Sequence, residues 1–193
     1  ALIEHLLHEG YSVVGIGRKK YGLLSDSIVN DNNFVFIQND LIDFDVNVLM
    51  SYQIDGILHL ANRGFVDGQG NINKGIGHDE IFNVNVQSTR KLIELAKLQE
   101  IKFLVFASSV SVFGKQPADP VISELTCPIP LDYYGLTKYY AERLIEIELA
   151  ETAAKGIVLR FPLIFSKDHL GGLVYTFYKL AASNEPIVIF GKG

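Results

Sequence analysis

The sequence predicts an α/β protein built on a doubly wound, parallel β-sheet. Apolar segments of strand length alternate along the chain with amphipathic segments of helix length. The segment 101–107 is almost continuously apolar, as expected for a parallel strand that is buried on both faces. A glycine-rich stretch, 64–77, follows another strand segment and is expected to form a loop. Open sheets of this kind bind ligands at such strand ends.

The first part of the chain predicts three strands. A helix is expected at Ala1–Glu9, followed by strands at Ser12–Ile16, Asn33–Ile37 and Asp55–Leu60. Each strand segment is short and mostly apolar, which is typical of buried parallel strands. A short helical segment is expected between the second strand and the third.

The second part predicts longer helices. Apolar residues such as Leu92 and Leu95 recur on one side of a helix at Asp79–Gln99. The remaining predicted elements, in order, are a strand at Ile101–Ala107, a helix at Asp132–Ala154, a strand at Ile157–Arg160, a helix at Leu170–Ala182 and a short strand at Ile187–Phe190.

The composition is that of a single globular domain and limits the possible partners. The 193 residues are 48% hydrophobic and 20% charged. The net charge of -5 favours neither nucleic acid nor an anionic membrane as a partner. The only cysteine, Cys127, excludes an intramolecular disulfide and favours a reducing, cytoplasmic location. No apolar stretch is long enough to span a bilayer, and the histidines do not form a metal-site pattern.

Ser109, Tyr134 and Lys138 are the candidate catalytic residues. Tyr134 and Lys138 are four residues apart in a predicted helix and therefore share a face. A nearby ammonium group favours a phenolate, so Lys138 is expected to lower the pKa of Tyr134 toward working pH. Such a phenol is a general acid or base for an alcohol/ketone pair. Ser109, at the end of the apolar segment, can hold the same substrate oxygen.

The tyrosine–lysine spacing is weak evidence by itself, because the chain contains a second pair, Tyr175 and Lys179. No serine-bearing strand precedes that second pair, and we interpret it as part of an amphipathic helix. The first pair follows a strand that ends in Ser108 and Ser109 and a proline-rich loop.

With this context, the chain resembles the extended short-chain dehydrogenases/reductases, the NAD-dependent epimerase/dehydratase family. Residues 106–114 resemble the family's strand-end serine motif, and the separation of Ser109 from Tyr134 also matches. The resemblance implies that residues 1–193 are a Rossmann-like NAD(P)-binding domain.

The resemblance also implies that the sequence is truncated at both ends. No glycine fingerprint precedes the strand at Val13, so we expect the family's first strand and phosphate loop to be missing. Residues 189–193 resemble the point where the family passes into its substrate domain. The missing strand would be central, and its removal would leave a gap of about 10 Å between its neighbours.

By resemblance, cofactor contacts fall on several segments. Asp40 and Leu41 are expected near the adenine, although Asp40 can equally be a residue that caps its own turn. Asn85 matches the family's helix asparagine near the active site, and a buried asparagine that kinks its helix is the alternative. His59 is expected to be a packed core histidine. The other expected cofactor residues are Leu60, Ala61, Asn62, Ala107, Tyr134, Lys138, Phe161 and Pro162.

The predicted cofactor is NADP in preference to NAD. NAD enzymes usually place a carboxylate after the strand that corresponds to Ser12–Ile16, where it accepts hydrogen bonds from the adenosine ribose. This chain has Gly17 there, followed by Arg18, which can pair with a 2′-phosphate. The alternative is a basic turn on the surface.

The predicted function is oxidoreductase or epimerase activity on a secondary alcohol or ketone of a nucleotide-linked sugar. Val110 and Ser111 stand where family dehydratases carry Asp-Glu, so a dehydratase is not expected. Leu163 stands where many nucleotide-sugar members carry asparagine. An NADPH-dependent reductase of a non-sugar ketone and a non-catalytic NADP-binding redox sensor remain open alternatives. A homodimer through the helices 79–99 and 132–154 is also expected.

Overall fold

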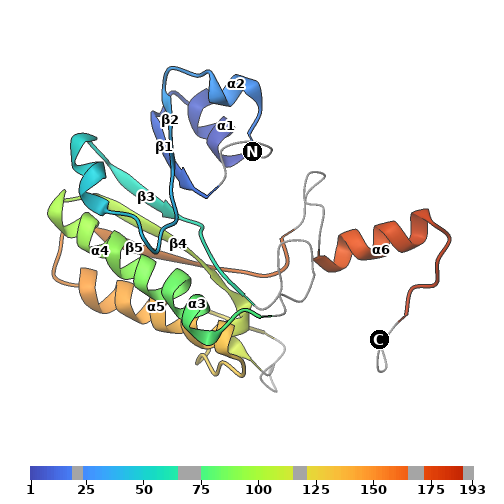
Figure 1. Cartoon of the computed structure of the whole chain (residues 1–193). Coiled ribbons are helices and arrows are strands. Elements are labelled where there is room, and N and C mark those ends of the chain that lie inside the picture. Colours follow the sequence, from blue (N-terminus) through green and yellow to red (C-terminus); the bar gives the residue numbers. More distant parts are fainter. Residues whose placement is uncertain (19–23, 65–74, 115–120, 165–171, 189–193) are drawn as a thin grey trace. The chain divides into compact units, whose positions relative to one another are not determined.

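The computed structural model describes residues 1–18, 24–64, 75–114, 121–164 and 172–188 (Figure 1). The chain divides into two compact units, Ala1–Tyr52 and Gln53–Gly193. Each unit contains its own parallel sheet, with strand order β1-β2 in the first and β3-β4-β5 in the second. The α/β class and the parallel strands are therefore as predicted.

The first unit is a small parallel pair of strands with short helices. Its elements are α1 (Leu2–His8), β1 (Val13–Gly17), α2 (Asp26–Val29), β2 (Phe34–Gln38) and the 3₁₀ helix η1 (Val46–Ser51). β1 and β2 pair in register from Val13 opposite Phe34 to Gly17 opposite Gln38. Gly15 lies against the Phe34 ring, where an added Cβ would come within 3.2 Å. The sequence predicted the bounds of α1, β1 and β2 to within one residue and the presence of η1 without bounds, and it missed α2.

The second unit carries the larger sheet and the long helices. Its strands are β3 (Gly56–His59), β4 (Phe103–Ser109) and β5 (Lys155–Phe161). Its helices are α3 (His78–Phe82), η2 (Asn83–Gln87), α4 (Ser88–Leu98), η3 (Val110–Phe113), α5 (Tyr133–Leu149) and α6 (Gly172–Ala182). Figure 1 shows α4 and α5 side by side along the sheet.

The core of this unit lies between β4 and the two helices. Leu104 and Phe106 of β4 are fully buried, since alternate residues of a strand share one face. Apolar residues of α4 and α5 cover that face, namely Leu92, Ile93, Leu95, Ala96, Ala141 and Ile145. This packing holds α5 against β4. The side chains of the first turns of α5 are therefore held near the carboxyl end of β4.

Three predicted elements differ in the structure. The helix expected at Asp79–Gln99 contains a π-helical stretch, η2, in its middle. The helix expected to reach Ala154 ends at Leu149, where the backbone N–H and the hydroxyl of Thr152 donate to the Leu149 carbonyl. Residues 187 and 188 are not in a strand, and residues 189–190 of that prediction lie outside the described part of the chain, as do residues 65–74 of the predicted loop.

Candidate active site at the carboxyl ends of β3, β4 and β5

Ser109 is the last residue of β4, and its side chain organises the turn that follows. Its Oγ accepts the N–H of Ser111 at 3.1 Å and also lies 3.1 Å from the Ser111 hydroxyl. This cap starts the 3₁₀ helix η3 immediately after the strand. The Ser109 hydroxyl is thus held at the carboxyl end of β4, where ligands bind in open parallel sheets.

The start of α5 is pressed against η3. The Asp132 carboxylate caps the helix by accepting the N–H of Gly135 at 2.6 Å. A Cβ at Gly135 would meet the Ser111 carbonyl oxygen at 2.5 Å, so a side chain would not fit at this position. This close approach brings Tyr134 into hydrogen-bonding range of the Ser109 hydroxyl. The two residues predicted to share a substrate oxygen are therefore adjacent.

The pKa of Tyr134 differs in direction from the sequence-based expectation. Burial raises this pKa above 10.0, the Ser109 hydrogen bond lowers it, and the Asp132 carboxylate raises it. The expectation that Lys138 lowers it is not met in the chain alone. The reason is that the Tyr134 phenol is mostly buried, and burial favours its neutral form.

Lys138 lies one turn further along α5 and is almost completely buried, with 1% exposure. Its Nζ lies 4.2 Å from the centroid of the Phe106 ring. Within the described residues, this Nζ has no hydrogen-bond partner. Burial lowers the pKa of Lys138 to about 8, and the Glu142 carboxylate opposes that shift. A buried ammonium with unused donors is suited to bind the hydroxyl groups of a ligand.

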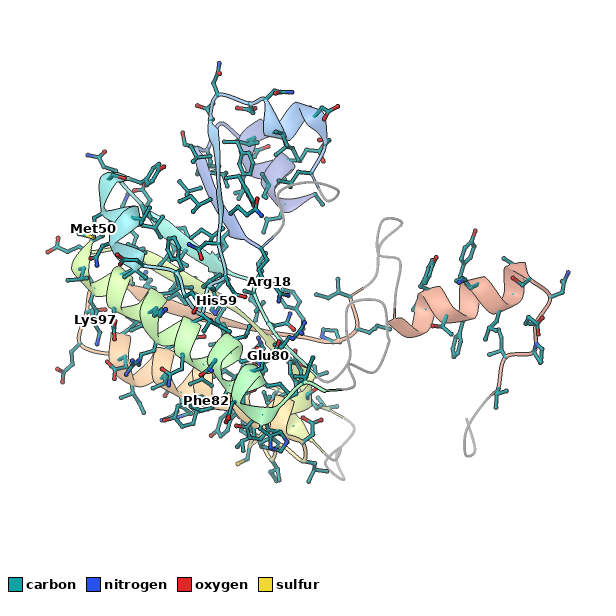
Figure 2. The ribbon with its side chains drawn as sticks, in the orientation of Figure 1. Arg18, Met50, His59, Glu80, Phe82 and Lys97 are labelled. Atoms are coloured by element: carbon teal, nitrogen blue, oxygen red, sulfur yellow. The ribbon has the colours of Figure 1, made fainter. Side chains whose placement is uncertain are left out.

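His59 ends β3 and is a buried, neutral residue, as predicted (Figure 2). Its Nε2 lies 3.0 Å from the Thr89 hydroxyl. Burial, together with the Lys138 charge, lowers the pKa of His59 to about 3. His59 therefore fills the core beneath the site without carrying charge at neutral pH.

Asn85 lies in η2 with its side chain fully engaged by the protein. Its Oδ1 accepts the Arg63 N–H at 2.7 Å, and its Nδ2 donates to the Arg63 carbonyl at 2.8 Å and to the Thr137 hydroxyl at 2.9 Å. Thr137 in turn donates to the Tyr134 carbonyl at 2.9 Å. Asn85 thus ties the segment after β3 to the turn of α5 between the two candidate catalytic residues. The alternative role, a buried asparagine in an irregular helix, is present in the structure.

The other expected cofactor residues of this unit gather at the same sheet edge. Leu60, Ala61 and Asn62 follow β3. Two residues further on, Gly64 lies against the Tyr134 ring, since a Cβ added to Gly64 would lie 3.4 Å from the Cδ2 atom of Tyr134. The remaining three come from the two other strands: Ala107 lies on β4, Phe161 pairs with Ser109 in the β4–β5 register, and Pro162 follows it.

Arg18, Asp40 and Leu41 belong to the first unit. Arg18 directly follows β1 and is exposed, and its carbonyl accepts a hydrogen bond from Gln38 at 3.2 Å (Figure 2). The Asp40 carboxylate accepts the Ile42 N–H at 3.1 Å. This is the turn-capping role that the sequence left open for Asp40.

Sequence reasoning missed Glu142, which is buried on the same face of α5 as Lys138. Its carboxylate accepts hydrogen bonds from Ser108 and Arg160. The four-residue spacing from Lys138 indicates a shared helix face, but it does not show that Glu142 is buried or which residues it binds.

The residues that the structure describes contain neither a metal-binding cluster nor a membrane-spanning helix. No group of three or more histidine, cysteine or carboxylate side chains there could hold a metal ion. In that same part of the chain, no helix is both long and apolar enough to cross a membrane.

The chain is similar to several known proteins. It is 28% identical to an uncharacterized UDP-glucose epimerase, YtcB, of Bacillus subtilis, and 27% identical to a UDP-glucuronate 4-epimerase of Thermodesulfobacterium geofontis. These matches cover 100% and 98% of this chain, but only 61% and 60% of the relatives. The chain therefore spans about three fifths of their length.

Solved structures give the same result. The UDP-glucuronic acid 4-epimerase of Bacillus cereus, in complex with NAD, matches all of this chain and 62% of its own, with a TM-score of 0.79 and 25% identity. MoeE5, in complex with UDP-glucuronic acid and NAD, matches all of this chain and 60% of its own, with a TM-score of 0.78 and 28% identity. The family model described as the NAD dependent epimerase/dehydratase family matches residues 1–193, and the chain belongs to that family.

Proposed function

We propose that this chain is the NAD(P)-binding part of an enzyme that epimerises a nucleotide-linked sugar by oxidising and re-reducing one secondary alcohol. The observation that carries the proposal is the packing of the first turn of α5 on the turn after Ser109, which places Tyr134 near Ser109 with Lys138 one turn along the same helix. As part of this proposal, both compact units belong to one cofactor-binding domain.

The residues of the second unit fit a dinucleotide. The buried Lys138 Nζ has no hydrogen-bond partner in the described part of the chain, and the hydroxyl groups of the nicotinamide ribose would supply acceptors. When bound, the cofactor supplies a hydride acceptor and donor. The segment Leu60–Asn62 and the residues Ala107, Phe161 and Pro162 would line its path along the sheet edge.

The remaining chemistry belongs to this chain. The Tyr134 phenolate takes the proton from the sugar hydroxyl during oxidation, and the resulting phenol returns it to the oxygen during reduction. Ser109 donates a hydrogen bond to the same oxygen and orients it. Lys138 follows Tyr134 by one turn of α5, and its ammonium would hold ligand hydroxyl groups beside the site of proton transfer.

The relatives support the substrate class. The B. cereus enzyme and MoeE5 have both been solved with UDP-glucuronic acid, which makes a UDP-sugar the first substrate to test. The absence of a carboxylate pair at Val110 and Ser111 removes the acid and base that a dehydratase of this family would use.

A second candidate is an NADPH-dependent ketone reductase, and Gly17 and Arg18 favour it. No carboxylate stands at this strand end to repel a 2′-phosphate, and the exposed Arg18 can pair with one. A redox sensor that binds the cofactor without catalysis has less support, because Tyr134 and Lys138 are both present.

The full-length protein tests these functions directly. Purified enzyme is incubated with UDP-glucuronic acid or UDP-glucose, and product sugars are identified by NMR without added cofactor. Interconversion of the C4 epimers supports the epimerase. Net consumption of NADPH with a ketone, and no epimer formation, favours the reductase. The absence of both activities with tight cofactor binding favours the sensor.

We also propose a homodimer formed through α4 and α5. The outer side of α5 exposes Leu136, Tyr140 and Ile147, which are 49%, 50% and 62% exposed and lie at helical spacing. Leu98 at the end of α4 is 62% exposed. An apolar stripe of this kind on two neighbouring helices suits a four-helix contact with a second copy.

A further inference from the structure

Glu142 occupies the third position of a regular series on α5. Tyr134, Lys138 and Glu142 are each four residues apart, so they share the helix face that packs on β4. Tyr134 contacts Ser109, Lys138 lies over Phe106, and Glu142 accepts a hydrogen bond from Ser108. The proposed reaction uses only the first two members of the series.

The Glu142 carboxylate joins three elements. It accepts hydrogen bonds from Arg160 Nε at 3.1 and 3.2 Å and from Nη2 at 2.8 Å. Arg160 belongs to β5, and its guanidinium lies 4.9 Å from the Phe113 ring of η3. The Ser108 hydroxyl brings in β4. Because two nitrogens of Arg160 bind both oxygens of Glu142, this pairing fixes the angle as well as the distance between the guanidinium and the carboxylate.

These partners are direct neighbours of site residues. Ser108 precedes Ser109, and Arg160 precedes Phe161. A shift of the Glu142 side chain would therefore move the ends of β4 and β5 relative to α5. Its own side chain is 5% exposed, and its oxygens are satisfied by Arg160 and Ser108.

Glu142 also acts on Lys138 through charge. Among the described residues, His59 of β3 and Glu142 of α5 interact electrostatically with the Lys138 ammonium, Arg160 of β5 binds Glu142, and β4 presents Phe106. His59 is neutral above about pH 3. The Glu142 carboxylate raises the pKa of Lys138 against the larger effect of burial.

We propose that Glu142 is a positioning residue that, through its bonds to Ser108 and Arg160, holds Ser109 and Phe161 in register with Tyr134, four residues from Lys138 on the same helix. This inference rests on the proposed function for its effect on turnover. Its effect on Lys138 does not depend on turnover.

The test uses three variants of the full-length protein. Glu142→Gln keeps the size of the side chain, removes the charge and replaces one acceptor oxygen by an amide donor. Glu142→Asp keeps the negative charge but shortens the side chain by one methylene, which moves the carboxylate away from Ser108 and Arg160. The control, Glu146→Gln, removes an exposed carboxylate of the same helix that pairs with Arg143. NMR titration of isotope-labelled lysine, assigned with Lys138→Arg, follows the Lys138 ammonium.

In Glu142→Gln the pKa of Lys138 should fall by about one pH unit, because a nearby opposite charge is lost. The alkaline limit of cofactor binding should move to lower pH by the same amount. In Glu142→Asp this limit should stay in place while turnover falls about tenfold or more through misalignment. Glu146→Gln should match the unaltered protein in both measurements.

An unchanged Lys138 titration in a folded Glu142→Gln protein overturns the electrostatic role. If that variant fails to fold, Glu142→Asp decides, and full turnover there overturns the positioning role. A lower melting temperature alone, with unaltered pH profiles, means an ordinary structural ion pair. If the unaltered full-length protein shows no turnover, the proposed function fails, whereas the Lys138 titration still tests Glu142.

Discussion

The ammonium group of Lys138 lies 4.2 Å from the centroid of the Phe106 ring, in the core of the second unit. Both residues are almost completely buried, and the ammonium has no hydrogen-bond partner in the described part of the chain. A site that keeps a cation ready for a ligand in this way loses folding stability until the ligand binds.

Replacing this cation should therefore stabilise the protein while it damages the site. The pKa of Lys138 in the folded state is about 8, against 10.5 ordinarily. Below pH 8 the folded protein carries a buried proton that the unfolded chain binds more favourably, and this costs about 3 kcal/mol at most. Lys138→Met should raise the melting temperature at pH 7, and should weaken both cofactor binding and turnover.

The pH dependence gives the sign of this effect. The loss of folding free energy caused by the buried Lys138 ammonium is fully present below pH 8. It disappears as the pH rises from 8 through 10.5, because in that range Lys138 is protonated only in the unfolded chain. The advantage of Lys138→Met should vanish over that range, as followed by thermal unfolding of both proteins. The control is Lys155→Met on the exposed first residue of β5, which should show no such dependence. A difference in melting temperature between Lys138→Met and the unaltered protein that stays constant at all pH values would contradict a lowered pKa for Lys138.

Removing the Tyr134 hydroxyl should abolish most turnover and leave binding intact. In full-length protein, Tyr134→Phe deletes the proton-transferring group, and such groups contribute about 10²- to 10⁴-fold. Affinity for the cofactor should change little. Tyr175→Phe is the matched control, since Tyr175 interacts with Lys179 of its own helix, 5.9 Å from the ring centroid. Normal turnover in Tyr134→Phe would rule out Tyr134 as the general acid and base.

Truncating Asn85 should loosen the turn of α5 that contains Tyr134 and Thr137. Asn85→Ala removes two hydrogen bonds to the Arg63 backbone and one to Thr137. Buried groups left unpaired cost about 1–3 kcal/mol each, so urea unfolding should show a loss of at least about 2 kcal/mol. Turnover should fall with it. Asn83→Ala, a half-buried neighbour in the same π-helical stretch, should cost less.

The cofactor preference rests on Gly17 and Arg18. One charge-assisted hydrogen bond is worth about 1.5–3 kcal/mol, or roughly ten- to a hundredfold in affinity. Full-length protein should bind NADPH more tightly than NADH, and the double change Gly17→Asp, Arg18→Asn should invert the order. Titration of both proteins with both cofactors measures this. Equal affinities in the unaltered protein would mean that the basic turn is only a surface.

The proposed dimer depends on the apolar stripe of α5. Tyr140→Glu places a charge in the middle of that stripe, where Tyr140 is 50% exposed, and should convert a dimer to a monomer in light scattering. Tyr178→Glu on α6, at a residue that is 68% exposed, is the control and should leave the mass unchanged. A mutant that remains dimeric would place the interface elsewhere.

The sequence determined the regular elements and the candidate site because both depend on local patterns. The buried strand β4 is apparent from its continuous apolar residues, and α5 from its helical spacing and its Asp132 cap. Tyr134 and Lys138 must share a face of any helix that contains both. The strand-end serine followed from the same order of residues, so the three candidate residues could be named without coordinates.

Only the tertiary structure decided what surrounds those residues. The π-helical stretch at Asn85 arises within a segment whose spacing fits a regular helix, and bonds to Arg63 and Thr137, 22 and 52 residues away, accompany it. The direction of the Tyr134 pKa follows from burial, which no local pattern reports. Glu142 could not be distinguished from a surface carboxylate until Ser108 and Arg160 were placed beside it. Burial and long-range partners depend on how the strands and helices pack, and a single sequence records that packing only indirectly.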